Sequence, residues 1–124
     1  MTYNNDEIKP IKQAVNLYFK GTYQGDAEQL KRAFHPEARI TGIFNGQSCD
    51  WSLSEFISRV TTLPTAEMKG ELYNKEILSV DITGYAAMAK ARVVVNELIF
   101  TDYITLLKIN DTWIIRNKSF TVGN

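Results

Sequence analysis

The sequence lacks most of the features that would give it a metal, a disulfide or a polyanionic partner. It has one cysteine, Cys49, and one histidine, His35, so it can form neither an internal disulfide nor a zinc site of the cysteine and histidine type. Its 14 Lys and Arg residues balance 14 Asp and Glu residues, which gives no general attraction to nucleic acid or anionic membranes. We therefore expect no metal, no nucleic-acid partner and a reduced cysteine.

Long apolar runs are also missing, and we expect no secretory leader. No apolar stretch approaches the ~20 residues that cross a bilayer, and the N-terminal sequence MTYNNDEIKP is polar and acidic. We expect a cytoplasmic protein with no membrane partner. The 124-residue length and 44% hydrophobic content are typical of one globular domain over residues 1–124.

The hydrophobic pattern places helices first and strands second. Apolar residues recur at three- and four-residue steps in the first half, and β-branched and aromatic runs separated by short polar turns follow. The predicted helices run from Asp6 to Tyr23, from a cap at Asp26 to Pro36, and from a cap at Ser52 or Ser54 to just before Pro64. The predicted strands are Ala38–Phe44, Gln47–Asp50, Leu72–Ile82, Ala86–Val95, Leu98–Ile109 and Thr112–Val122. This order predicts an α+β fold whose helices cover one face of a mostly antiparallel sheet.

Several short segments resemble a known superfamily. They are YFKG at 18–21, GDAEQL at 25–30, FHPEA at 34–38, TDYITLLK at 101–108, WII at 113–115 and NK at 117–118. The chain resembles the nuclear transport factor 2-like (cystatin-like cone) superfamily, and within it the branch named putative lumazine-binding. The resemblance implies three helices in the concave face of a strongly curved mixed sheet, and usually a homodimer through the outer sheet face. Such cones serve as isomerase-like and dehydratase-like enzymes, cyclases, ligand binders and transport adaptors, so the fold does not choose a function.

The turns allow the sheet faces to be assigned. Two-residue loops at Asn96-Glu97 and Asn110-Asp111 place alternate residues on a core face and an outer face. The expected core face is Ala89, Ala91, Val93, Phe100, Asp102, Ile104, Leu106, Trp113, Ile115, Asn117 and Ser119. The expected outer face includes Lys90 and Lys118. It also carries Leu107, Ile114, Tyr103 and Phe120 beside Arg92 and Arg116, an apolar patch that we expect to form the dimer interface.

Three polar residues, Asp102, Asn117 and Ser119, are thus expected on an otherwise apolar face, with Asp102 opposite Ser119, and we expect all three to contribute to a ligand-binding site. Asp102 could be a pocket base with Tyr18 as proton donor, or a structural acid whose hydrogen bonds fix the sheet.

Aromatic residues could line a ligand cavity or simply fill the core. We expect Tyr18, Trp51, Phe56 and Phe100 to line the cavity. His35, beside Pro36, is expected to cap a helix end, and Cys49 to be inert because no basic partner lies near it in sequence.

Three functions remain open on this sequence. The first is binding of a small, largely apolar molecule, aromatic or pteridine-like, with no cofactor. The second is a cofactor-independent isomerase, dehydratase or cyclase that uses Asp102 and Tyr18. The third is a dimeric interaction module without a ligand.

Overall fold

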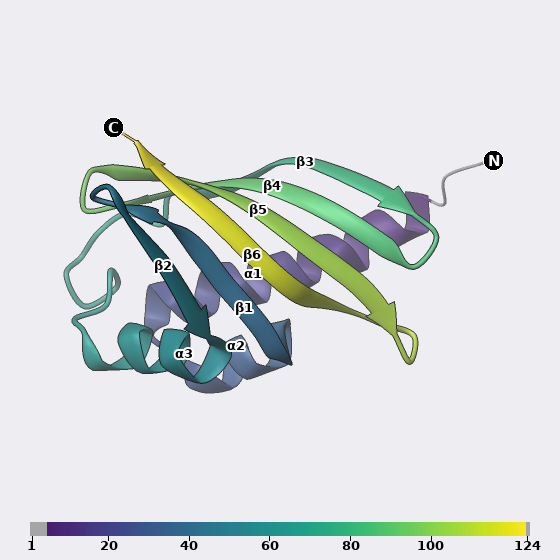
Figure 1. Ribbon diagram of the computed structural model, residues 1–124, viewed down its shortest axis with the longest axis horizontal. Helices are drawn as coiled ribbons and strands as arrows, with labels where there is room; N and C mark the ends of the chain where they lie inside the picture. Colours follow the sequence, from purple (N-terminus) through teal and green to yellow (C-terminus); the bar gives the residue numbers. More distant parts are fainter. Residues whose placement is uncertain (1–4, 124) are drawn as a thin grey trace.

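The computed structural model describes residues 5–123, in which helices cover one face of a curved sheet (Figure 1). The helical elements are η1 (Asn5–Glu7), α1 (Ile8–Gln24), α2 (Ala27–Ala33) and α3 (Leu53–Thr62). The strands are β1 (Phe34–Phe44), β2 (Gln47–Ser52), β3 (Lys75–Thr83), β4 (Ala86–Val95), β5 (Leu98–Ile109) and β6 (Thr112–Gly123). The α+β prediction is confirmed.

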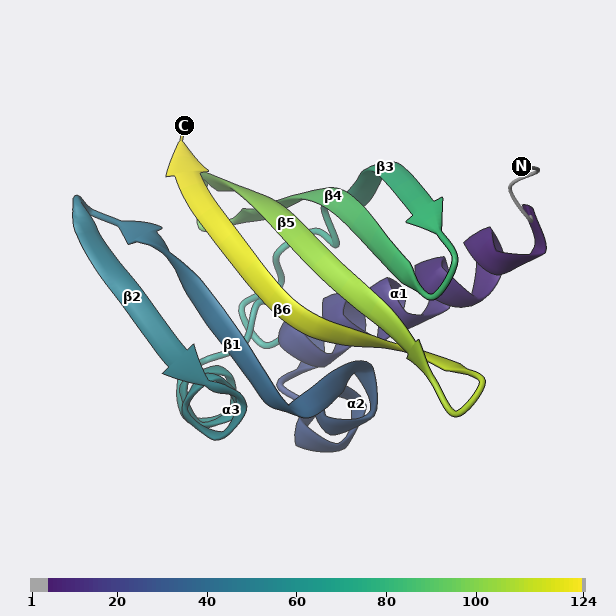
Figure 2. The ribbon, with the colours of Figure 1, turned by 45° about the vertical axis from the view of Figure 1, so that its right-hand side comes forward.

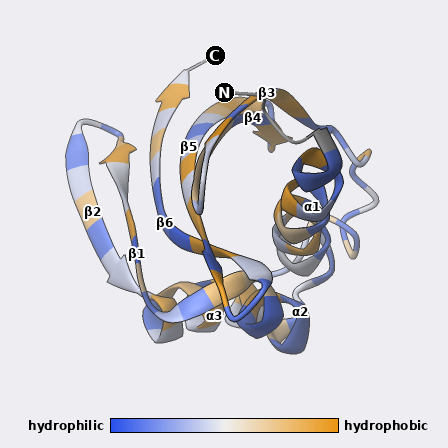
Figure 3. Ribbon diagram, turned by 90° about the vertical axis from the view of Figure 1, so that its right-hand side faces the viewer, coloured by the Kyte–Doolittle hydropathy of each residue, from blue (hydrophilic) through white to orange (hydrophobic). Residues whose placement is uncertain are grey.

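The sheet is mixed and open. Its strand order is β2-β1-β6-β5-β4-β3, with β1 and β6 parallel and every other neighbouring pair antiparallel. The strands curl over α1, and α2 and α3 lie below the end of the sheet formed by β1 and β2 (Figures 2 and 3). The more hydrophobic side of α1 faces the concave side of the sheet (Figure 3). The expected cone of helices inside a curved sheet is therefore confirmed.

The helix ends follow local chemistry. Gly25 ends α1 in the left-handed conformation, at φ 67°, which glycine adopts without a Cβ clash. The Asp26 side chain accepts hydrogen bonds from two backbone N–H groups at the start of α2. Ser52 and Glu55 form a reciprocal capping box at α3, so Ser52 is the cap rather than Ser54.

The second helix ends earlier than expected. We predicted that Pro36 would end it and that a strand would begin at Ala38, whereas α2 ends at Ala33 and β1 begins at Phe34. Phe34 is already extended, at φ −109° and ψ 145°, and it pairs with Ile115 of β6. Pairing with a strand far along the chain therefore overrides the local helix signal.

The hairpin loops have the expected form. Both residues of Asn45-Gly46, Asn96-Glu97 and Asn110-Asp111 have positive φ, as a two-residue turn of type I′ requires. The predicted pairs at the loop ends, Val95 with Leu98 and Ile109 with Thr112, are both present.

A β-bulge in β6 changes the face assignment of its second half. Leu106 pairs with Ile115 but Thr105 pairs with Asn117, so Arg116 is an extra residue with no partner on β5. Every residue after the bulge is shifted to the opposite face.

The predicted faces of four residues are therefore wrong. Asn117 and Ser119 are exposed on the outer face, whereas Lys118 and Phe120 are buried on the core face. Asp102 is on the core face as expected, but it pairs with Phe120 rather than with Ser119.

Gly42 allows β1 to pass close to Phe120. A Cβ at this position would lie 2.6 Å from both the ring and the backbone oxygen of Phe120. The close approach lets the Phe120 ring stack against Trp51, with 6.1 Å between the ring centroids. Within residues 5–123, no helix is long and apolar enough to cross a membrane.

Candidate functional site

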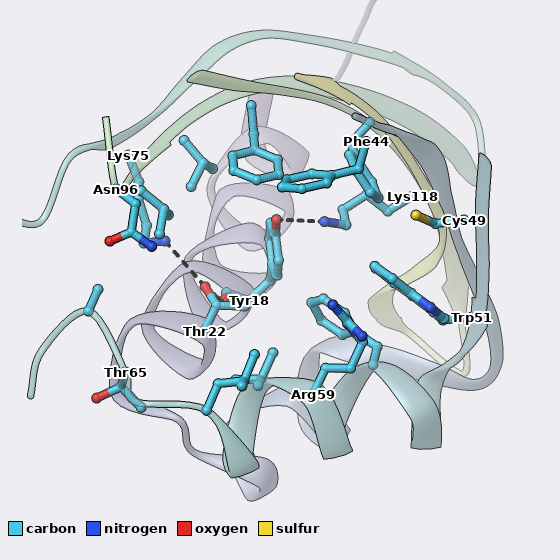
Figure 4. A pocket seen from close by; sticks show the side chains of 18 of the residues that line it. Tyr18, Thr22, Phe44, Cys49, Trp51, Arg59, Thr65, Lys75, Asn96 and Lys118 are labelled. Atoms are coloured by element: carbon cyan, nitrogen blue, oxygen red, sulfur yellow. Dashed lines mark hydrogen bonds between the residues drawn. The ribbon is translucent and has the colours of Figure 1, made fainter. Parts of the chain in front are cut away.

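A cavity of about 330 Å³ lies between the helices and the concave face of the sheet (Figure 4). Its volume is at the small end of the range for ligand pockets. The side chains that line it come from α1, α3, the segment after α3, all six strands and the turn between β4 and β5. They are Tyr18, Thr22, Phe44, Cys49, Trp51, Phe56, Arg59, Val60, Leu63, Pro64, Thr65, Ala66, Lys69, Lys75, Val93, Val95, Asn96, Phe100, Lys118 and Phe120.

Three ionisable side chains meet at one wall of this cavity. The Lys118 amino group donates a hydrogen bond of 2.9 Å to the Tyr18 hydroxyl, which donates one of 2.5 Å to Asp102 Oδ2. Lys118 Nζ lies 3.7 Å from the second carboxylate oxygen, Oδ1. Tyr18 comes from α1, Asp102 from β5 and Lys118 from β6, so the cluster exists only when the sheet is packed on the helix.

The Lys118 amino group lies among aromatic rings. It is 4.7 Å from the ring centroid of Tyr18 and 5.1 Å from those of Phe56 and Phe120. The residue is only 5% exposed. Burial lowers the pKa of Lys118, and the charge of Asp102 opposes that change. The amine is therefore more readily neutral than that of a surface lysine.

Asp102 lies behind the other two groups. It is 0% exposed and does not line the cavity. Its Oδ1 atom has no hydrogen-bond partner within residues 5–123. Burial, followed by the charge of Asp102, raises the pKa of Tyr18 well above its usual value, so the hydroxyl keeps its proton while it accepts a hydrogen bond from Lys118 and donates one to Asp102.

A second lysine, Lys75 of β3, points into the cavity. Its amino group donates a hydrogen bond of 3.3 Å to Thr22 Oγ1, one helical turn beyond Tyr18 on α1. Burial, followed by repulsion from Lys118, lowers the pKa of Lys75 to about 8. On another wall, the Arg59 guanidinium lies 4.5 Å from the ring centroid of Trp51.

The family model described as "Putative lumazine-binding" matches residues 6–121. The chain belongs to this family. The aldolase FrzH of Cladobotryum sp. is 26% identical to this lumazine-binding-family protein over 118 residues, which cover 94% of this chain and 91% of that protein.

Solved structures show the same fold. An NTF2-like protein of unknown function from Shewanella baltica has a TM-score of 0.85 at 20% identity, with 100% of this chain and 99% of the other covered. A ketosteroid isomerase-like protein from Erwinia carotovora atroseptica has a TM-score of 0.73 at 12% identity, with 98% and 99% covered. The family member described here therefore has the nuclear transport factor 2-like fold.

The structure brings together four of the seven residues expected to bind ligand. Tyr18, Trp51, Phe56 and Phe100 line the cavity. Asp102 does not line it but contacts Tyr18 and Lys118, which do.

The two remaining candidates, Asn117 and Ser119, lie outside the cavity. The Asn117 side-chain oxygen accepts a bond of 3.0 Å from the Arg39 backbone N–H, and the Ser119 hydroxyl lies 2.7 Å from that of Thr41. Both contacts connect β6 to β1 on the outer face.

Sequence reasoning missed the two lysines that approach the cavity. Lys118 was assigned to the outer face because strict alternation was continued through the bulge, and Lys75 was placed within a strand without a role. The residues next to Lys75 and Lys118 in the sequence are polar and carry no local sign that either lysine will approach a cavity.

His35 differs from its expected environment. The His35 ring accepts a hydrogen bond of 3.0 Å at Nδ1 from the Glu37 backbone N–H, within the start of β1, instead of capping the helix carbonyls. Cys49 of β2 is partly buried and lines the cavity. Among the side chains of residues 5–123, no group of three or more His, Cys, Asp or Glu could hold a metal ion.

Proposed function

We propose that this protein binds a small carbonyl compound in the cavity and performs aldol-type chemistry on it, with Lys118 as the reacting amine. The observation that carries the proposal is the hydrogen-bonded chain from Lys118 through Tyr18 to Asp102 at the cavity wall. A lysine amine becomes a nucleophile towards carbonyl groups when an apolar site and nearby groups favour its neutral form.

The chain gives Lys118 a route to lose its proton. The ammonium passes a proton to the Tyr18 oxygen while Tyr18 passes its own to Asp102 Oδ2, which leaves a neutral amine and a neutral carboxylic acid. Two neutral groups are less costly to keep in a water-poor site than a separated ion pair. Asp102 thus acts through Tyr18 and need not touch the substrate.

The same chain can carry each later proton transfer. The amine adds to the substrate carbonyl, and the resulting carbinolamine loses water with a proton that Tyr18 supplies and Asp102 replaces. The Tyr18 oxygen then takes the α-proton of the iminium while Tyr18 passes its own proton to the Asp102 carboxylate, which gives an enamine. The enamine attacks a second carbonyl, whose oxygen takes a proton from Tyr18, and water finally hydrolyses the iminium and restores Lys118.

Similarity to a known enzyme supports aldol chemistry over the other reactions considered. The Cladobotryum relative is an aldolase, and the two chains match over nearly their whole lengths. An isomerase, dehydratase or cyclase using Asp102 and Tyr18 would need the carboxylate or hydroxyl alone and would leave the buried lysine without a role. Binding of an aromatic or pteridine-like ligand without catalysis would use the same aromatic cavity.

A diketone probe tests the proposal directly. Acetylacetone forms a stable, ultraviolet-absorbing enaminone with a neutral lysine amine. We expect one adduct per chain, located on Lys118 by peptide mass spectrometry, and none in Lys118→Met. We also expect wild type, but not Lys118→Met, to cleave a fluorogenic β-hydroxyketone. Lys90→Met, on the outer face, is the matched control. An adduct spread over surface lysines, or equal cleavage by Lys118→Met, would contradict the proposal.

We also propose that two copies pair through the outer sheet face. Tyr103, Leu107 and Ile43 are exposed there, although Phe120, expected in this patch, is buried in the core. Exposed apolar side chains on a sheet face favour association when the two faces are complementary. Light scattering at micromolar concentration should give twice the chain mass, and Tyr103→Glu should give monomer. A monomeric wild type would refute the pairing.

A cytoplasmic location is proposed as well. Cys49 has no disulfide, which suits a reducing compartment. Fractionation of producing cells, with the protein detected outside the cytoplasm, would refute this.

A further inference from the structure

The cavity is positively charged on several sides. Four of its lining side chains are cationic, namely Arg59, Lys69, Lys75 and Lys118, and none is acidic. A single positive group in a cavity can serve the reaction itself. Four such groups, with no carboxylate among the residues that line the cavity, create a field that attracts an anion and disfavours a cation.

Two of these cations already have a carboxylate beside them. Lys118 has Asp102 at 3.7 Å, and Lys69 has Glu71 at 3.2 Å. These pairs hold the lysines in place and partly neutralise them.

The other two cations, Arg59 and Lys75, contact no carboxylate within 4.0 Å among residues 5–123. Arg59 is exposed, and its guanidinium lies over Trp51. Lys75 is more deeply placed, and the 3.3 Å bond to the neutral Thr22 hydroxyl is the only hydrogen bond that its amino group makes within residues 5–123. Lys75 is therefore the interior cation that has no negatively charged group in contact with it among these residues.

The two lysine amino groups lie on either side of the Tyr18 hydroxyl (Figure 4). A ligand whose carbonyl group lies at Lys118 would extend past Tyr18 towards Lys75 and Thr22. Its far end would then meet an ammonium and a hydroxyl, both of which can donate hydrogen bonds to a carboxylate.

We infer that the substrate is a keto acid: an apolar or aromatic carbonyl compound whose carboxylate, separate from its reacting carbonyl, binds Lys75. This inference rests on the proposed function for the carbonyl, while the anion site rests on Lys75 alone. Repulsion between the two lysines supports it, since Lys118 contributes to the lowered pKa of Lys75, and an anion between them would relieve that repulsion. Arg59 at the rim adds to the same field and draws the anion in.

The experiment compares a keto acid with its uncharged ester. Benzoylpropionate and its methyl ester share a ketone and a phenyl ring and differ in the carboxylate charge. Each is added at neutral pH, where Lys75 is charged, and the slowing of acetylacetone labelling at Lys118 gives its affinity. We expect the acid to protect Lys118 at about tenfold lower concentration than the ester, and added salt to reduce the difference.

Variants identify the cation. Lys75→Met should remove most of the tenfold preference and leave labelling of Lys118 in place, whereas Lys75→Arg should restore the preference. Lys90→Met is the control on the outer face. Circular dichroism verifies that each variant is folded, and Lys75→Gln replaces the methionine variant if that one does not fold. Equal protection by acid and ester, no protection by either, or an unchanged preference in Lys75→Met would overturn the inference.

The two proposals fail in different ways. If acetylacetone does not label Lys118, the proposed aldol chemistry fails. In that case the affinities of the acid and the ester, measured by calorimetry, still decide whether the anion site exists. If Lys118 is labelled but acid and ester protect it equally, the aldol proposal stands and the keto-acid inference fails.

Discussion

Removing one member of the buried pair should reveal how strongly Lys118 and Asp102 depend on each other. Their side chains are 6% and 0% exposed, so water replaces almost none of the lost interaction. In Lys118→Met the Asp102 carboxylate keeps only the Tyr18 hydroxyl as a partner. Breaking a buried pair in this way typically costs about 3–5 kcal/mol of stability, and we expect a loss of that size at neutral pH.

The reciprocal change should be milder. In Asp102→Asn the amide oxygen can still accept the Tyr18 hydrogen bond, and Lys118 can release its proton because burial has already lowered its pKa. We expect a loss of about 1–3 kcal/mol. In the double variant, methionine packs among the rings and no charge is left unpaired, so stability should return to within about 1 kcal/mol of wild type.

Urea unfolding, monitored by tryptophan fluorescence, gives the free energy of unfolding of the wild type, the two single variants and the double variant. The coupling energy from this cycle should be at least about 2 kcal/mol, with similar denaturant slopes throughout. If Lys118→Met lost less than about 1 kcal/mol and the double variant equalled the sum of the single ones, the pair would not be a buried, mutually dependent unit.

Three further changes test the electrostatics, packing and capping. Burial lowers the pKa of Lys75 from about 10.5 to about 8 in the folded protein, so between these values the unfolded chain holds more protons and stability should rise with pH, by up to about 3 kcal/mol from this residue. Chemical unfolding across this range should show a smaller rise in Lys75→Met, in which only the lowered pKa of Lys118 still contributes, and parallel curves would contradict the burial of Lys75. Gly42→Ala should lose about 1–3 kcal/mol, since the new methyl group meets the Phe120 backbone oxygen as well as its ring; a melting temperature equal to wild type would show that β1 can move away. Ser52→Ala should lower the free energy of unfolding by about 0.5–2 kcal/mol, because the Glu55 backbone N–H loses the Ser52 side-chain oxygen that accepts its hydrogen bond. Ser54→Ala, in the first turn of the same helix, is the matched control and should melt near wild type.

Features that depend on neighbours along the chain could be predicted from the sequence. The left-handed end of α1 at Gly25, the Asp26 cap and the Asn45-Gly46 turn each follow from one or two residues whose backbone preferences or side-chain bonds act within a few positions. The helix-then-strand order follows from the period of apolar residues. The inward face of β5, with Asp102, could be predicted because no bulge lies between it and its turn.

The cluster of Lys118, Tyr18 and Asp102 was decided by the tertiary structure. One extra residue at Arg116 reverses β6, so Lys118 enters the core and Asn117 leaves it. No residue type in the segment requires a bulge there. The bulge arises because β6 must form hydrogen bonds with β5 on one side and with the parallel strand β1 on the other while the sheet bends over α1. Alternation along a strand is a local rule, but the residue at which it is interrupted is set by partners far away in sequence. For this reason the sequence alone could identify Tyr18 and Asp102, whereas only the folded sheet placed the lysine beside them.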